Sequence, residues 1–374
     1  MSGSIRVGSL FGIPFYISYS WFFIFGVVTI SLTFGQYPEI LPLWPKSTHV
    51  ILGIITSLLF FGSVILHELA HGIVARSVGL PVKSITLFLF GGVAHISSEA
   101  TKPVSELLMA IVGPFSSLLL AAAFGLVWMV SSPLFAPVAA AASWLALVNV
   151  ILAIFNMVPG FPLDGGRVFR STLWWLTGNF HLSTRIAIIS GRLIAYLLIL
   201  GGIVMVLLEP DLLLNGIWII MIGWFLERSA SSSGRQFRMR NYLQEYTAKD
   251  LMTKDYAMVQ GETTLEELVD RYVTETSWKR SLVLDGSQLM GVINLRSIRR
   301  FAKTQWPVVT AVQAMVPVDN LAKLGPEENI LDVMERLGED RYGQALVVQE
   351  NKLLGILAIE NIMEIVRTRG RLKV

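Results

Sequence analysis

The sequence predicts a polytopic α-helical membrane protein with six transmembrane helices, a short β-hairpin after the second of them, and an α/β module at the C-terminal end. Its composition is the first reason: 53% of the 374 residues are hydrophobic and 15% are charged, whereas roughly 25% of a typical water-soluble domain is charged. The second reason is a change near Arg228, where long apolar stretches give way to sequence with ordinary numbers of charged residues. We therefore expect one part of the chain in lipid and the other in water.

Six apolar stretches are long enough to cross about 30 Å of hydrocarbon, which takes roughly 20 residues of helix. The predicted spans are residues 15–34, 50–74, 104–130, 137–157, 186–208 and 212–226. Arg6 is the one charged residue before the first span, and no cleavage-like site of small residues follows that span. We therefore interpret the first span as retained in the membrane and not as a signal peptide.

Lysine and arginine are concentrated in every second loop. The segment before span one, the loops between spans two and three and between four and five, and the segment after span six are basic, whereas the opposite loops hold Lys46 as their one basic residue. Cytoplasmic loops are enriched in these residues. We therefore expect a multi-pass protein of the cell membrane, with both termini and the C-terminal module in the cytoplasm.

A pentapeptide with three ionisable residues, His67-Glu68-Leu69-Ala70-His71, interrupts the second span. Two histidines at this spacing project from one face of a helix, where both imidazoles can bind one Zn²⁺. Glu68 could then take a proton from a water that zinc has made acidic, with a pKa of about 7. The alternative is a chance pentapeptide, or buried histidines satisfied by polar neighbours. Ionisable residues inside a span are candidates for function by default, which favours the metal site.

A third ligand is expected from Asp164, in the segment that follows the fourth span. Pro159 and Pro162 push the residues before them out of the helical region, so we expect Asp164 on irregular backbone that protein or a water-filled cavity must cover. Counted along the two helices from the outer surface, His67 lies roughly 25 Å deep and Asn156 roughly 28 Å deep. Both segments therefore reach the same depth, near the inner face. The alternative for Asp164 is a turn or helix-capping aspartate.

Two further features surround this predicted site. Asn156 could donate its amide to the oxyanion that forms when a peptide carbonyl is attacked, or could satisfy the end of a helix. Residues 82–96 are rich in β-formers and interrupted by paired glycines, which predicts a short hairpin. The edge of that hairpin could bind an extended peptide by strand addition, or the segment could be an interfacial loop without a partner. We interpret His95 as a loop histidine.

Together these motifs resemble the site-2 protease family of intramembrane zinc metalloproteases. The resemblance rests on the helix-borne His-Glu-x-x-His, the Gly-Gly hairpin and Asn-x-x-Pro-x-x-Pro-Leu-Asp-Gly-Gly-Arg, in that order. It implies one zinc per chain, an active site toward the cytoplasm, and cleavage of a transmembrane helix of a substrate protein, often an anti-sigma factor or another membrane-tethered regulator. The ligands that it implies are His67, His71 and Asp164, and the catalytic base is Glu68.

The C-terminal part contains an internal repeat. Residues 247–305 and 306–370 each contain an opening segment, an amphipathic helix, a pair of apolar strands and a closing helix, at a period of about 60 residues. This pattern resembles a tandem pair of CBS domains. We therefore expect a transmembrane metalloprotease domain at 1–230, a linker at 231–246 and the two CBS domains after it.

CBS pairs often bind adenine nucleotides, but this sequence departs from the family pattern at the ribose-binding positions. The usual threonine and aspartate are Asn294 and Ser297 in the first repeat and Ala358 and Asn361 in the second. Two roles therefore stay open for the module: binding of an adenine nucleotide, or dimerisation and docking without one, which includes a homodimer through the CBS domains.

The resemblance implies an intramembrane zinc endopeptidase that performs regulated intramembrane proteolysis, with the CBS domains regulating access or activity. One alternative is a CBS-gated membrane transporter or channel with the ionisable cluster as its ion site. Another is an inactive homologue that binds membrane partners. The net charge of +3 and the scattered basic residues argue against a nucleic-acid partner. The chain has no cysteine, which excludes disulfides and thiolate metal ligands.

Overall fold

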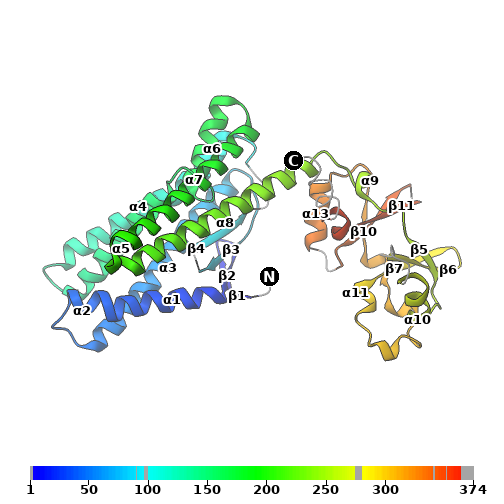
Figure 1. The fold of residues 1–374 in the computed structure, drawn as a ribbon, viewed down its shortest axis with the longest axis horizontal. Helices are drawn as coiled ribbons and strands as arrows, with labels where there is room; N and C mark the ends of the chain where they lie inside the picture. Colours follow the sequence, from blue (N-terminus) through cyan, green and yellow to red (C-terminus); the bar gives the residue numbers. More distant parts are fainter. Residues whose placement is uncertain are drawn as a thin grey trace. The chain divides into compact units, whose positions relative to one another are not determined.

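The computed structural model describes residues 3–89, 91–96, 100–273, 280–339, 342–350 and 352–363. The chain divides into two compact units, Met1–Gly234 and Arg235–Val374. Figure 1 shows the helical first unit in blue to green and the mixed α/β second unit in yellow to red.

Within the described residues, six helical segments of the first unit are long and apolar enough to cross a membrane. They are Tyr19–Ile40, Lys46–Ser77, Pro103–Ser131, Ala136–Asn156, Phe180–Leu208 and Pro210–Leu243. The second, third, fourth and fifth of these are α3, α4, α5 and α7. The first consists of α1 (Tyr19–Ser31), a π-helical turn (Leu32–Gln36) and α2 (Tyr37–Ile40), and the last consists of a 3₁₀ turn (Pro210–Leu212) and α8 (Leu213–Leu243). The six predicted spans are therefore confirmed.

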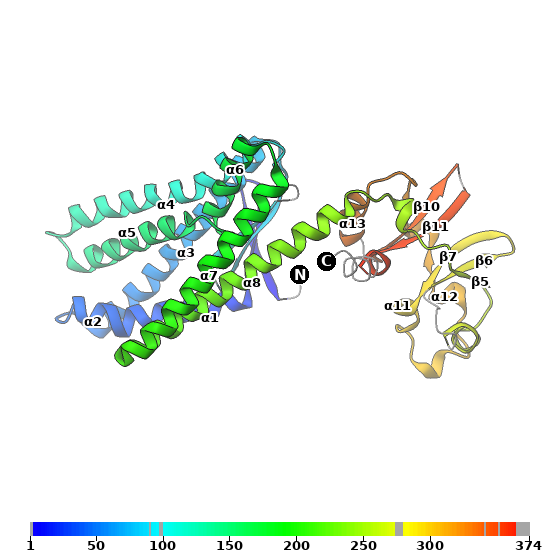
Figure 2. The ribbon, with the colours of Figure 1, turned by 45° about the horizontal axis from the view of Figure 1, so that its top comes forward.

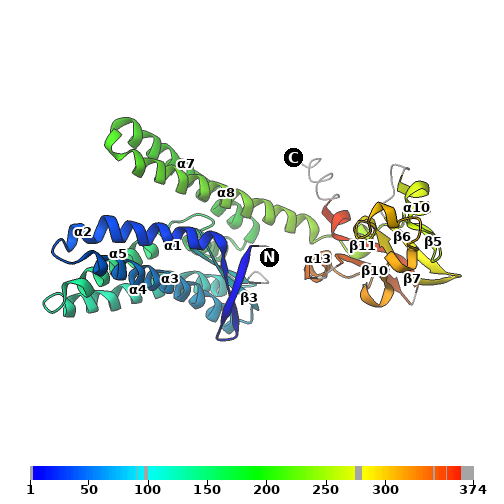
Figure 3. The ribbon, with the colours of Figure 1, turned by 90° about the horizontal axis from the view of Figure 1, so that it is seen from below.

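The surfaces of these helices are those of a membrane protein. Leu58, Leu126 and Ile154, on α3, α4 and α5, are 52%, 64% and 65% exposed, which suits side chains that face lipid. Figure 2 and Figure 3 show α7 and α8 as a side-by-side pair, and an ion pair of 3.7 Å between Arg192 and Glu227 joins them.

A four-stranded sheet packs against the end of α3. Its strands are β1 (Ser4–Leu10), β2 (Ile13–Ser18), β3 (Val82–Phe88) and β4 (Gly91–Ile96), in that order across the sheet. The β1–β2 and β3–β4 pairs are antiparallel, and β2 and β3 are parallel. Ile13, Ile85, Leu69 and Met109 are buried together where the sheet meets α3 and α4. This core holds the sheet beside the helix that carries the histidine motif.

The sheet confirms one prediction and corrects two. The hairpin predicted at 82–96 is β3–β4, although Phe90 lies outside the described residues. Residues 15–18, predicted as the start of the first span, belong to β2, because pairing with β1 and β3 takes up their backbone groups. His95, predicted in a loop, lies on β4 opposite Ser84.

The second unit repeats one arrangement twice. In the first repeat β5 (Ala257–Gln260) is parallel to β6 (Arg280–Asp285), which is antiparallel to β7 (Gln288–Asn294). In the second, β9 (Ala322–Leu324) is parallel to β10 (Gln344–Gln349), which is antiparallel to β11 (Lys352–Ala358). The short helices and the remaining strand are α9 (Ala248–Leu251), α10 (Leu265–Leu268), α11 (Leu295–Ile298), α12 (Ala311–Ala314), β8 (Val316–Pro317) and α13 (Ile330–Glu339). The predicted closing helix of the second repeat lies outside the described residues beyond residue 363.

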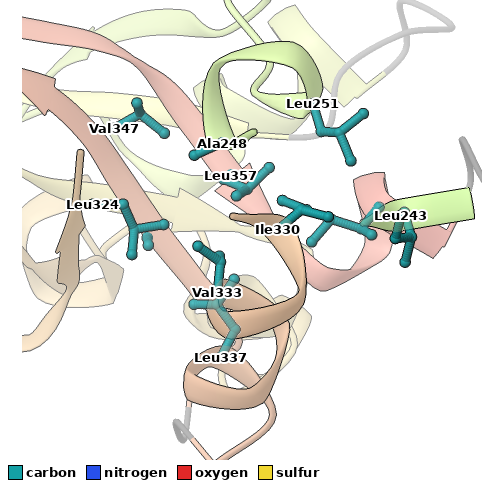
Figure 4. Packing of buried hydrophobic residues seen from close by; sticks show 11 residues of the cluster. Leu243, Ala248, Leu251, Leu324, Ile330, Val333, Leu337, Val347 and Leu357 are labelled. Carbon is teal, nitrogen blue, oxygen red and sulfur yellow. The ribbon is translucent and has the colours of Figure 1, made fainter. Parts of the chain in front are cut away.

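The opening segment of each repeat packs on the other repeat. The core of the second repeat includes Leu251 from α9, in the opening segment of the first repeat, and Leu243 from α8, just before that segment (Figure 4). In the same way, Ala311 and Ala314 of α12 belong to the core of the first repeat. Residues 231–246, predicted as a linker, are helical as far as Leu243, because that end of α8 has a core to pack against.

Candidate metal centre

Three potential ligands from distant parts of the chain meet in the first unit. His67 and His71 are buried on α3, at 3% and 4% exposure, and Asp164 is the first residue of α6 (Asp164–Thr177). Asp164 Oδ2 lies 3.1 Å from the Nε2 atom of each histidine, and the two Nε2 atoms are 3.2 Å apart. The meeting of these residues agrees with the depth count from the sequence.

The three atoms fit a zinc ion. Tetrahedral zinc with bonds of about 2.0 Å to nitrogen and oxygen has ligand atoms on the order of 3.3 Å apart. The ligand atoms of His67, His71 and Asp164 all lie within 4.8 Å of one another. Two imidazoles and one carboxylate are also a usual set of protein ligands for catalytic zinc, which keeps its fourth position for water or substrate.

Helix α4 orients both imidazoles through their second nitrogen atoms. His71 Nδ1 lies 2.5 Å from the Met109 carbonyl oxygen, and because a carbonyl can only accept, Nδ1–H is the donor. The Nε2 lone pair of His71 is therefore free to point at Asp164 and the centre. His67 Nδ1 lies 2.9 Å from Ser117 Oγ. Partners of this kind fix the tautomer and the ring orientation of metal-binding histidines.

Helix α4 also approaches the imidazoles more closely than a side chain would allow. A Cβ atom at Gly113 would overlap the His71 ring and lie 2.7 Å from His67 Nε2, so only glycine fits here. Gly113 is not among the residues that the sequence predicted for the site. Its one available signal is the spacing of Met109, Gly113 and Ser117, which places them on one face of a helix.

The carboxylate of Glu68 is held by strand β4. The backbone N–H of Ala94 donates to Glu68 Oε2 at 3.1 Å. At Gly92 a Cβ atom would overlap Glu68 Cγ and lie 3.1 Å from Glu68 Cδ, so the strand can lie this close because Gly92 has no side chain. Since β4 is the last of the described strands in its sheet, its outer edge faces the residue next to His67.

Asp164 lies beside the histidines, as predicted, but it does not lie on irregular backbone, and that part of the prediction was wrong. The irregular stretch ends at Leu163, whose extended backbone precedes α6, and Asp164 begins the helix. The cause is that the two prolines exclude helix only up to Pro162, and an aspartate in the first turn is favoured by the helix dipole. Asn156 is the last residue of α5 and is partly buried.

Sequence comparisons match both units to known families. The profile described as Peptidase family M50 matches residues 55–141 and 125–201, and the CBS domain profile matches 248–304 and 312–368. A curated protein of Synechocystis sp., sll0528, is 37% identical over 372 residues, 98% of this chain and 97% of that protein, and is provisionally named a zinc metalloprotease. The chain belongs to peptidase family M50, the site-2 proteases. This M50 peptidase also carries a tandem pair of CBS domains.

A second curated relative is similar over nearly the whole length of both chains, and a solved structure over part of this chain. Zinc metalloprotease MJ0392 of Methanocaldococcus jannaschii is 27% identical over 369 residues, 97% of this chain and 96% of that protein. The solved site-2 protease of the same organism is 28% identical and covers 62% of this chain and 94% of its own, with a TM-score of 0.42. The family, the fold class and the class of enzyme predicted from the sequence are confirmed: this M50 peptidase is a zinc metallopeptidase of the membrane, and the transporter or channel is set aside.

Proposed function

We propose that this M50 peptidase cleaves a transmembrane segment of a membrane-tethered substrate protein, with one zinc held by His67, His71 and Asp164. The observation that carries the proposal is the meeting of these three ligand atoms beside Glu68. Zinc bound there would polarise the scissile carbonyl and acidify the attacking water. The residues of the chain supply the remaining steps.

Glu68 is the catalytic base in this mechanism. Its carboxylate takes the proton of the attacking water as the new C–O bond forms and then delivers that proton to the leaving amide nitrogen. The hydrogen bond from the Ala94 N–H keeps the carboxylate next to the ligand pair. Asn156, at the end of α5, is proposed to donate its amide to the developing oxyanion.

The outer edge of β4 is the proposed binding site for the substrate peptide. A helix uses its own backbone hydrogen bonds, so its carbonyls are shielded until the segment unwinds. An unwound segment can add to β4 as a further strand and recover hydrogen bonds there. Because Ala94 on this strand contacts Glu68, a peptide paired with β4 would pass directly beside the base.

The arrangement in the membrane follows from the charges. Arg76 lies in the last turn of α3, about one and a half turns after His71 and two and a half after His67, and the basic loops are on the same side as this end of the helix. Since basic loops are cytoplasmic, we place both termini, the CBS domains and the active site toward the cytoplasm of the cell membrane. A membrane-tethered regulator of the anti-sigma-factor type is a substrate that fits this position.

The CBS pair is proposed to regulate access or activity, as a homodimer or by docking. Its residues do not fit the usual ribose contact. Asn361 accepts a hydrogen bond of 2.6 Å from Arg280, and Asn294 accepts one of 2.9 Å from the Ser297 N–H and donates one of 2.9 Å to Gln344. Three of the four ribose-contact positions, Asn294, Ser297 and Asn361, are hydrogen-bonded within the chain, so no step of the proposal uses a nucleotide.

The proposal is tested by replacing Glu68 with glutamine. The purified Glu68→Gln protein should keep its zinc and lose proteolysis, because glutamine cannot accept the proton. Comparing membrane-protein fragments in cells that make the natural or the Glu68→Gln protein should reveal substrates as fragments found only with the natural protein. Cleavage by purified, zinc-loaded Glu68→Gln would overturn the mechanism.

A further inference from the structure

A buried ion pair lies near the ligand cluster without belonging to it. Glu106 is in the first turn of α4 and is fully buried. Arg170, on α6, donates to Glu106 Oε1 through Nε at 2.7 Å and also through Nη2. Arg167, also on α6, places its Nε 4.0 Å from the same oxygen, and a buried charge is tolerated when opposite charge and hydrogen bonds compensate it. The pair therefore fixes α6 to the start of α4.

Two aromatic rings hold the same guanidinium. Arg170 Cζ lies 5.0 Å from the ring centre of Phe161 and 4.9 Å from that of Phe180, distances at which a cation is attracted to an aromatic face. Phe161 precedes α6 and Phe180 begins α7. Arg170 thus ties together the chain on both sides of the helix that Asp164 begins.

One face of α4 supports all three proposed ligands. Met109 and Ser117 orient the two histidines, and Gly113 lies between them against the imidazoles. Glu106 is three residues before Met109, so it continues the same helical face. Through Arg170 this face of α4 contacts α6, the helix that Asp164 begins. The chain before Asp164 is irregular backbone.

We propose that the Glu106–Arg170 pair positions Asp164 for the metal, as Met109 and Ser117 position the histidines. The inference rests on the ligand set proposed above. Arg170 lies six residues after Asp164 on one helix, so a displacement of α6 from α4 moves the carboxylate away from the imidazoles. Arg170 is a positioning residue, since it acts on Asp164 through the helix that the two residues share.

The test is a double-mutant cycle on zinc affinity, measured on the purified full-length protein with a competing chelator. Arg170→Gln should raise the zinc Kd about 10- to 100-fold, the usual effect of losing an outer-shell partner. In an Asp164→Ala background the same substitution should change the Kd by less than about 3-fold, because the ligand that it positions is gone. Arg185→Gln, which removes an exposed arginine at the start of α7, is the matched control and should leave the Kd unchanged.

The outcomes separate this inference from the ligand set. Equal weakening by Arg170→Gln in both backgrounds would mean that the pair supports the fold in general, and would overturn the inference. An unchanged Kd for Arg170→Gln, with weak binding by Asp164→Ala, would also overturn it and leave the ligand set standing. An unchanged Kd for Asp164→Ala would overturn both. If Arg170→Gln does not fold, the cycle is run with Arg170→Lys, which keeps the charge and loses one of the two hydrogen bonds.

Discussion

Gly113 shows how much of the proposed metal centre depends on a residue that has no side-chain chemistry of its own. The imidazoles of His67 and His71 occupy the space where its side chain would stand. The Nδ1 atoms of the two histidines are hydrogen-bonded to Ser117 and Met109, which lie one turn after and one turn before Gly113 on α4. The geometry of the centre is therefore set by α4 as much as by the helices that carry the ligands.

Gly113→Ala tests this dependence. Alanine is favoured over glycine in a helix by about 1 kcal/mol, but here its methyl group would displace both imidazoles, so zinc affinity should fall at least about tenfold. Gly125→Ala on the same helix is the control, since a Cβ atom there meets nothing within 4 Å. Measured zinc affinity should be unchanged in the control. Equal affinities for the two variants would contradict the close packing of α4 on the histidines.

Zinc stoichiometry follows from the ligand count. Elemental analysis of the purified protein should give about one zinc per chain, because three ligands and one open position describe a single catalytic site. His67→Ala should lose that zinc, whereas His95→Ala, which alters an exposed histidine on β4, should retain it. Full zinc content in His67→Ala would exclude His67 as a ligand.

Among the elements, β4 has the most specific part in the proposed reaction. It is the last described strand of its sheet, and the backbone N–H of its Ala94 donates to Glu68. The strand can therefore hold the base in position and still offer its edge to a peptide.

Ala94→Pro removes that N–H and leaves the β3–β4 pairing in place, since proline is tolerated where the N–H faces away from the neighbouring strand. Zinc content should be retained, and the rate of cleavage should fall about 100-fold because the base is no longer positioned. Val93→Ala, which keeps every backbone N–H, should cleave at nearly the natural rate. A normal rate for Ala94→Pro would show that the contact with Glu68 is dispensable.

The opening segment of each CBS repeat packs in the core of the other repeat, so a substitution there should destabilise one repeat more than the other. Leu243→Ala leaves a cavity in the core of the second repeat, which should destabilise that core by about 2–5 kcal/mol. Hydrogen exchange should accelerate in β10 and β11 more than in β6 and β7. Val308→Ala, at a site 77% exposed, should leave exchange unchanged. Equal acceleration in both repeats would contradict the assignment of Leu243 to the second core.

For the whole molecule, the sequence predicted most where a local pattern decides the structure. Length and apolar composition were enough for the six spans, and counting residues along the helices placed His67 and Asn156 at a similar depth, which made Asp164 a candidate partner of His67. The β1–β2 hairpin was missed because its partner, β3, lies more than 60 residues away along the chain. The pairing that defines residues 15–18 as strand is therefore invisible locally. The role of Gly113 was missed for the same reason, since it exists only where α4 meets α3.

The cysteine-free chain offers a direct test of its orientation in the membrane. A single cysteine in place of Ser47, which is exposed at the start of α3, should react with a membrane-impermeant maleimide added outside the cell. One in place of Glu262, which is exposed in the first CBS repeat, should react only after lysis. Labelling in the opposite pattern would reverse the topology inferred from the loop charges.

The ligand cluster joins α3 to a residue that follows α5, with two complete spans between them. A nascent chain therefore cannot assemble the centre until its fourth span has entered the bilayer and residue 164 has left the ribosome. With the proposed ligand set, metal loading is then a late event in biogenesis, and an interrupted translation product that ends before Asp164 carries the histidine motif without the proposed third ligand.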